Sequence, residues 1–149
     1  WMKGMNLTGL KPGISYKYYQ PDKDINMITS FKTAVVNTGV ADNISLAKKQ
    51  RTEKFAFEFT GYIKITKDGM YTFYTQSDDG SKLFIDDEEV VDNDGDHGST
   101  EVSGKAALKK GYHKIKVIYY DSGGGNVLKI LFNAEGKDKV ELPGSMLFH

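Results

Sequence analysis

The chain has 149 residues, a length at which one domain buries roughly 68 to 70% of the surface that its unfolded chain exposes. Lysine plus arginine and aspartate plus glutamate each number 20, and this balance argues against the basic surface that nucleic acids require. No apolar run approaches the roughly 18 to 20 residues that span a bilayer, and no cysteine is present for disulfides or thiolate metal sites. We therefore expect one globular domain, residues 1–149, without a nucleic-acid partner or membrane insertion. The opening Trp1-Met2 indicates a fragment of a larger multidomain protein.

Alternating apolar positions predict β-strands through most of the chain. In residues 55–65 every second position is apolar or glycine, and a turn at residues 67–69 leads into a second alternating run. Further runs occupy residues 83–85, 90–91, 102–108, 113–120 and 128–132. Turn signals about ten residues apart are typical of an antiparallel β-sandwich. Residues 45–54 have a helix-forming composition, but no segment has convincing helical periodicity. Residues 1–10 and those after 133 are predicted to be edge or capping pieces.

The signatures of common catalytic centres are absent from the sequence. There is no nucleophile elbow and no His-Glu-x-x-His, and the glycine-rich residues 123–126 lack the Gly-Lys-Ser/Thr ending of a phosphate loop. The three histidines, His97, His113 and His149, are scattered, and we expect them to be structural or solvated. The chain is therefore predicted to be non-catalytic.

A polar stretch at residues 92–98 resembles a calcium-binding EF-hand loop at first sight. The match fails because His97 stands where that loop needs glycine, and Ser103 stands where it needs a bidentate glutamate. This stretch is predicted to be a polar hairpin connection, in which Asp92, Asn93 or His97 can touch a ligand.

Two adjacent carboxylates, Asp78 and Asp79, follow a predicted strand and precede Gly80. Neighbouring like charges cost free energy unless donors or a cation satisfy them, so the pair favours a hard cation with oxygen ligands, such as calcium. The alternative is a turn whose aspartates cap backbone amides and face water. A second loop, residues 121–126, adds a carboxylate, an amide and three glycines that allow close approach of the backbone. Whether the two loops meet is left open at this stage.

The order of these segments resembles the PA-fourteen domain family, named after the fourteen-kilodalton N-terminal portion of anthrax protective antigen. The likeness covers nearly the whole chain and is carried by residues 12–19, 59–63, 68–73, 77–86, 90–93, 111–113, 117–120 and 142–143. It implies an all-β module of the β-sandwich type, attached to a larger protein such as a glycosidase, an adhesin or a toxin.

In lectin-like members of that family, two adjacent aspartates joined by a cis peptide bind calcium, which in turn holds vicinal sugar hydroxyls. Asp78 and Asp79 match that pair. The family's later loop supplies an asparagine side chain and two backbone carbonyls, and the matching positions here are Asp121, Gly123 and Gly125. Aspartate in place of asparagine keeps an oxygen ligand and adds charge, but it leaves the sugar contacts open.

The resemblance thus implies a calcium-dependent carbohydrate-binding module outside the cytoplasm. Its partners would be a glycan and the catalytic domain of its parent, which we expect to be a bacterial secreted glycoside hydrolase, such as a β-hexosaminidase, or an adhesin. Beside Asp78 and Asp79, the candidate sugar contacts are Asn126, His97 and Tyr120. The alternative is a structural accessory domain that shapes a neighbouring domain or mediates protein contact without binding sugar.

Overall fold

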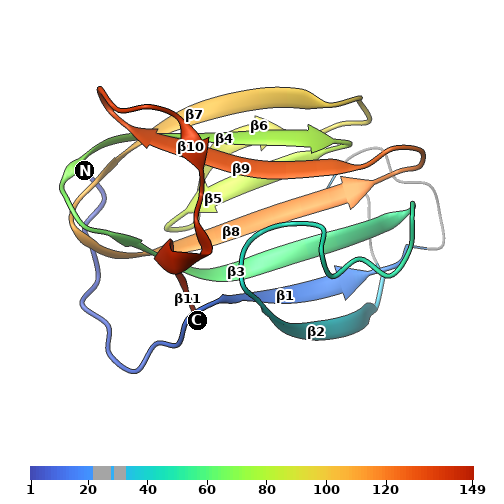
Figure 1. Ribbon diagram of the computed structural model, residues 1–149, viewed down its shortest axis with the longest axis horizontal. Coiled ribbons are helices and arrows are strands. Elements are labelled where there is room, and N and C mark those ends of the chain that lie inside the picture. The colour runs from blue at the N-terminus through green and yellow to red at the C-terminus, as the bar shows by residue number, and fades with distance from the viewer. Residues whose placement is uncertain (22–27, 29–32) are drawn as a thin grey trace.

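Two antiparallel sheets lie face to face in the computed structural model, which describes residues 1–21, 28 and 33–149 (Figure 1). One sheet has the strand order β2-β1-β3-β8-β5-β6, with β11 beside β3, and the other has the order β10-β9-β4-β7. The larger sheet comprises β1 (Ile14–Tyr19), β2 (Val35–Ala41), β3 (Phe55–Ile65), β5 (Ser81–Ile85), β6 (Glu88–Asn93), β8 (Gly111–Asp121) and β11 (Leu147–Phe148). The smaller sheet comprises β4 (Gly69–Asp78), β7 (Thr100–Leu108), β9 (Val127–Ala134) and β10 (Val140–Glu141), and a 3-10 turn, η2, covers Gly144–Met146. The expected antiparallel β-sandwich is confirmed.

The core lies between the sheets and is built by the period-2 pattern of the strands. In β3, the inward-facing Phe55, Phe57 and Phe59 are buried, and in β4 Phe73 faces them from the other sheet. Fully burying one such side chain contributes about 1.5 to 3 kcal/mol, so a strand with several of them fixes its own register. The pairing of β3 with β8 accordingly runs without a break from Phe55 opposite Asp121 to Ile65 opposite Gly111.

A glycine allows close packing of the two sheets on one side of the sandwich, where β6 of the larger sheet crosses β7 of the smaller. A Cβ atom at Gly104 in β7 would overlap the carbonyl oxygen of Val90 in β6. The two strands can therefore approach this closely only because residue 104 has no side chain.

The connections follow the predicted turns with one difference. The β5–β6 turn is tight, since Asp86 and Asp87 both have positive φ, at 49° and 68°, which suits a two-residue hairpin turn. The predicted polar connection at residues 92–98 begins later than expected, because β6 continues to Asn93. Residues 45–54 form a loop, in agreement with their lack of helical periodicity. The N-terminal segment caps β8 through the bridge between Met5 and Tyr112. No described helix is long and apolar enough to cross a membrane.

Strands β4 and β8 finish at the same end of the sandwich, and β3 and β9 begin there (Figure 1). The turn after β4 is fastened to β8 by backbone hydrogen bonds, from Asp79 N to the Tyr120 carbonyl at 3.2 Å and from Tyr120 N to the Gly80 carbonyl at 3.0 Å. The fold thus brings together the loops that the sequence left apart.

Candidate metal centre

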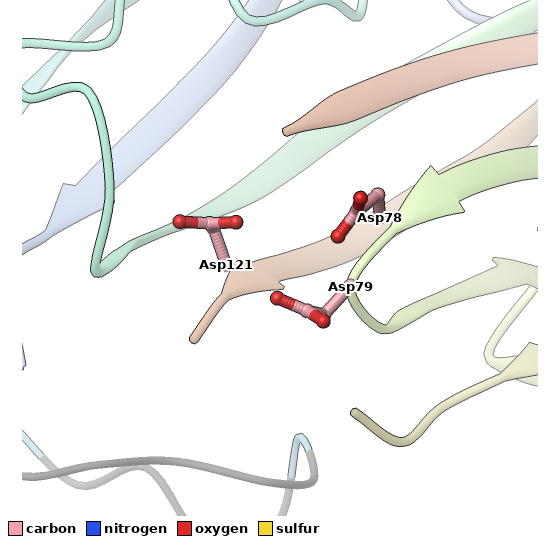
Figure 2. Close-up of side chains that lie close together, drawn as sticks. All are labelled: Asp78, Asp79 and Asp121. Carbon is pink, nitrogen blue, oxygen red and sulfur yellow. The ribbon is translucent and has the colours of Figure 1, made fainter. Parts of the chain in front are cut away.

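Three aspartates from two strand ends point into one space (Figure 2). Asp78 and Asp79 come from the end of β4 and are joined by a cis peptide bond, and Asp121 is the last residue of β8. A carboxylate oxygen from each lies within 4.8 Å of those from the other two. In the described part of the chain, this is the one such cluster of histidine and acidic side chains, and the polar residues 92–98 form none.

Asp79 is held by donors from two other loops. Its side chain is 4% exposed, and its Oδ1 accepts a hydrogen bond from His97 N at 3.1 Å. Its Oδ2 accepts from Ser122 N at 2.8 Å and lies 3.0 Å from Ser122 Oγ. The same hydroxyl lies 2.5 Å from Asp96 Oδ1, and since a hydroxyl has one proton it can donate to only one of these carboxylates at a time. These contacts fix the orientation of Asp79.

Asp121 is buried, and only one of its two carboxylate oxygens accepts a hydrogen bond from the described residues. Its Oδ2 accepts from Lys54 N at 3.0 Å, whereas its Oδ1 has no hydrogen-bond donor opposite it in the described part of the chain. An orphaned carboxylate oxygen in a fully buried side chain is costly, because burial removes the water that would otherwise solvate it. This oxygen marks the position at which a cation would compensate the cluster.

The pKa values of the cluster reflect the same cost. Burial, together with the charges of Asp79 and Asp78, raises the pKa of Asp121 to about 7. Burial also raises the pKa of Asp79, while the hydrogen bond from the Ser122 hydroxyl lowers the pKa of the exposed Asp96. A bound divalent cation would reverse the shifts of Asp79 and Asp121, because it favours the charged form of each carboxylate.

The glycine-rich loop between β8 and β9 lies against this cluster. The nearest atom to a Cβ built on Gly125 would be Asp78 Oδ2, at 3.8 Å, so Gly125 stands beside the aspartates. Gly123, with φ of 146°, lies toward Glu53 instead, and the Glu53 carboxylate accepts a hydrogen bond from Gly124 N at 2.8 Å. The loop is therefore fastened on its outer side by the β2–β3 connection.

The family model of the PA14 domain matches residues 10–141, which is most of the chain. The chain belongs to the PA14 domain family. The resemblance carried by the sequence segments is thereby confirmed, and the paired aspartates occupy the turn after β4 in this PA14 domain.

Similar domains occur in proteins of different kinds. A β-hexosaminidase of Porphyromonas gingivalis is 27% identical over 97% of this chain, and the chain spans only 20% of that enzyme. An anti-sigma factor domain-containing protein from Clostridium clariflavum has a similar structure, with a TM-score of 0.77 and 23% identity over 92% of this chain and 47% of that one. The PA14 sugar-binding domain from an RTX adhesin is also similar, with a TM-score of 0.75 and 17% identity over 93% of this chain and 98% of that one. These two structures show the shared fold.

The three residues predicted as additional sugar contacts have different surroundings. Tyr120 is fully buried beneath Gly80 and beside Ile28 and Ala56, so its ring offers no exposed face for stacking on a sugar. Asn126 is half-buried, and its amide joins Lys49 Nζ, at 2.9 Å, to the carbonyl of residue 52, at 2.5 Å. A sugar contact by Asn126 stays a prediction.

His97 contributes its backbone to Asp79 and turns its ring toward its own loop. The ring nitrogens lie 2.7 Å from the Gly98 carbonyl and 2.9 Å from the Asn93 carbonyl. Partial burial alone would lower the pKa of His97, but the two carbonyls and the nearby Asp79 raise it. The expectation that the histidines are structural agrees with this arrangement, and also with His113, which is buried between Asp86 Oδ2, at 2.6 Å, and the carbonyl of residue 109, at 2.7 Å.

A buried polar network begins at Ser77, the residue before Asp78 of the aspartate cluster. Ser77 Oγ and Ser81 Oγ are 2.6 Å apart, and Ser81 Oγ donates to Thr75 Oγ1 at 3.0 Å. The amide of Asn93, which is 4% exposed, donates to the Thr75 carbonyl at 3.1 Å and to the Thr100 carbonyl at 2.9 Å. Asn93 is thus a structural residue that connects β6 to β4 and β7, and its side chain is not free to contact a ligand.

Sequence reasoning missed several residues that shape this site. Ser122 orients Asp79, Glu53 fastens the glycine-rich loop, and Lys49 bonds to Asn126. Ser122 had a usable signal, because it directly follows Asp121. Glu53 and Lys49 had none, since nothing in the sequence indicates that the β2–β3 connection returns to this end of the sandwich.

Proposed function

We propose that this PA14 domain is a non-catalytic, calcium-dependent carbohydrate-binding module of a larger protein. The observation that carries the proposal is the Oδ1 atom of Asp121, which is buried without a donor from the described residues and lies near the carboxylates of Asp78 and Asp79. An acidic cluster alone would fit a solvated turn, but an orphaned buried oxygen within it calls for a cation.

The donor set suits calcium. Calcium takes six to eight oxygen ligands at about 2.3 to 2.6 Å, with carboxylates and backbone carbonyls among them. Asp78, Asp79 and Asp121 would supply the carboxylate oxygens, and the backbone at Gly123 and Gly125 would supply carbonyls. Bound calcium would offer its remaining coordination positions to vicinal hydroxyls of a sugar. The protein's own part is to hold Asp79 by Ser122 and His97, and to keep water from Asp121 by burial.

Two relatives support a sugar ligand and a glycoside hydrolase or an adhesin as the parent protein. The RTX adhesin domain of similar structure is described as a PA14 sugar-binding domain, and a relative at 27% identity is a β-hexosaminidase. We therefore infer a glycan ligand, a parent chain that is a glycoside hydrolase or an adhesin, and a location outside the cytoplasm. Because the three carboxylates are committed to one ion, they are not placed to act as a general acid and base.

A structural accessory role is the competing function, and one observation favours it. Asp79 already accepts hydrogen bonds from two backbone amides, which can stabilise the turn without any ion. This reading predicts a domain that supports a neighbouring domain and responds to neither calcium nor sugar.

The test is titration calorimetry of the chain with simple sugars and a glycan panel, in millimolar calcium and in chelator. We expect binding in calcium that disappears in chelator and in Asp78→Asn. The matched control is Asp138→Asn, an exposed acid on the β9–β10 connection, which should bind like the wild type. Calcium binding without any sugar binding would reject the carbohydrate function, and the absence of both would favour the accessory role.

A further inference from the structure

The two loops that flank the metal cluster carry opposite charge. On one side, residues 42–54 connect β2 to β3 and contain four exposed cations and two exposed acids. Three of these cations, Lys48, Lys49 and Arg51, are called the basic rim. On the other side, the end of β6 and its connection to β7, residues 92–99, contain three aspartates, 92, 94 and 96. The site is therefore flanked by cations on one side and by aspartates on the other, a difference in charge that its three central carboxylates do not explain.

In the described part of the chain, no carboxylate forms an ion pair with Lys48, Lys49 or Arg51. The ammonium group of Lys49 donates to the neutral amide oxygen of Asn126 at 2.9 Å, and Arg51 Nη1 donates to the Lys54 carbonyl at 3.3 Å. Elsewhere on the surface lysines do pair, as Lys82 does with Glu89 at 2.8 Å and Lys139 with Glu101 at 3.0 Å. The cations of the basic rim are thus available to an anion from outside.

The basic rim is fixed against the site rather than merely near it. Lys54 N bonds to Asp121 Oδ2, the Asn126 amide bonds to the carbonyl of residue 52, and Gly124 N bonds to Glu53. These contacts join the β2–β3 connection to the loop that follows Asp121 at several points. One amide side chain, that of Asn126, separates the Lys49 ammonium from the glycine that stands beside Asp78.

The acidic side, in contrast, directs its charge inward. Asp94 Oδ1 accepts from Ile28 N and Gly95 N, both at 2.8 Å, and Asp96 Oδ1 lies against Ser122 Oγ. Those carboxylates are occupied with backbone and hydroxyl donors. Among the residues that the structure describes, the cations of the basic rim thus lack ion pairs, whereas Asp94 and Asp96 accept hydrogen bonds.

We propose that the ligand of this site is an acidic sugar, whose carboxylate or sulfate group lies on the basic rim while its ring hydroxyls reach the metal cluster. The proposal rests on the proposed calcium-dependent sugar binding and adds the chemical class of the sugar. Arginine and lysine form charge-assisted hydrogen bonds with carboxylates and sulfates, and such bonds are about twice as strong as neutral ones. Because the rim is exposed, the preference will weaken as salt screens it, over a Debye length of about 8 Å at physiological ionic strength.

The experiment compares ligands that differ only in charge. Trigalacturonate is titrated against its methyl ester, which keeps the sugar rings and removes the charge, and galactose 6-sulfate is titrated against galactose. All titrations use the whole chain in saturating calcium at low and physiological salt. The first pair tests a uronate source of the anion and the second tests a sulfate source.

The test variant is Lys48→Gln/Lys49→Gln/Arg51→Gln, and the control is Lys11→Gln/Lys105→Gln/Lys137→Gln, which removes equal charge from exposed positions outside the β2–β3 loop. Glutamine at position 49 retains an N–H donor for Asn126. Because galacturonate itself binds calcium, the comparison of the two variants cancels that contribution. Thermal melts with calcium and chelator verify that both variants fold and bind the ion.

We expect at least one anionic ligand to bind about tenfold more tightly than its neutral partner at low salt. The preference should shrink at higher salt, vanish in the test variant and persist in the control. Equal affinity for charged and neutral members, or a preference that survives in the test variant, would overturn this inference and leave the carbohydrate function standing. If no sugar of either kind binds while calcium still stabilises the chain, the carbohydrate function fails, and the inference fails with it.

Discussion

Asp121 at the end of β8 faces Asp79 in the turn after β4. The two carboxylates are held close together by hydrogen bonds between the backbones of the two segments, not by bonds of their own side chains. The Asp79 amide donates to the Tyr120 carbonyl, and the Tyr120 amide donates to the Gly80 carbonyl. The fold thereby forces like charges into one buried space. Without a cation, this crowding of carboxylates costs free energy, so the stability of the fold should respond to calcium and to pH.

Calcium should stabilise the chain, and Asp121→Asn should remove that response. At a calcium concentration 100 times the dissociation constant, the free energy of unfolding rises by roughly 2.7 kcal/mol. For a domain of this size the melting temperature should therefore rise by several degrees. Without calcium, Asp121→Asn should be at least as stable as the wild type near neutral pH, because it removes one of three crowded carboxylates. The measurement is differential scanning calorimetry in millimolar calcium and in chelator.

Asp138→Asn serves as the control and should keep the wild-type calcium response. A purely structural Asp121 would give the reverse pattern, with Asp121→Asn less stable than the wild type in chelator and no calcium effect on either protein.

Stability in chelator should fall as the pH rises from about 4 to about 7. The unfolded chain ionises Asp121 near its ordinary pKa of about 3.9, whereas burial beside Asp79 and Asp78 raises the pKa of folded Asp121 to about 7. Between these values the folded state binds more protons than the unfolded state. The stabilisation is therefore complete below the unfolded pKa and is lost as the pH rises through the folded pKa.

The check is a series of thermal melts at about pH 5 and about pH 8. The fall should be smaller in Asp121→Asn, which cannot titrate at this position. Calcium should reverse the trend in the wild type, since it binds the ionised carboxylates that appear as the pH rises. A wild-type pH profile in chelator that matches that of Asp121→Asn would rule out the raised pKa.

The strands and the aspartate pair could be predicted because their signals are local. Period-2 alternation in residues 55–65 specifies a strand with one buried face, and adjacent carboxylates before Gly80 indicate a turn. Asp121 was found through the family resemblance, and the packing of the Gly80 backbone against β8 explains why it meets the pair.

The remainder depended on contacts between distant segments. Asn93 belongs to a polar sequence, which favoured a solvated loop, but the Thr75 and Thr100 carbonyls draw its amide into the core. Tyr120 follows the outward-facing pattern of β8, yet Ile28 and Ala56 cover it. No local pattern reveals which outward-facing residue another segment will bury.

Gly104→Ala should destabilise the fold without contacting the three-aspartate cluster. The added methyl group would overlap the Val90 carbonyl, so β6 and β7 would have to separate at a cost of about 1 to 3 kcal/mol or more. Urea denaturation of this variant should show a lower midpoint than that of Gly98→Ala, whose new methyl group meets no atom within 4 Å. Equal midpoints for the two variants would mean that β6 and β7 do not approach as closely as the structure has them.

Asn93→Ala should weaken both the sandwich and the site that it supports. The variant loses the hydrogen bonds that the buried Asn93 amide donates to the Thr75 and Thr100 carbonyls, which costs about 1 to 3 kcal/mol. Since β4 carries Asp78 at its end, we also expect the molecules that remain folded to bind calcium more weakly than the wild type does. The matched control is Glu88→Ala, an exposed change in the same strand that should stay within about 0.5 kcal/mol of the wild type. Urea denaturation and calcium titration measure the two effects, and a variant as stable as Glu88→Ala would show that the Asn93 amide is solvated rather than part of the core.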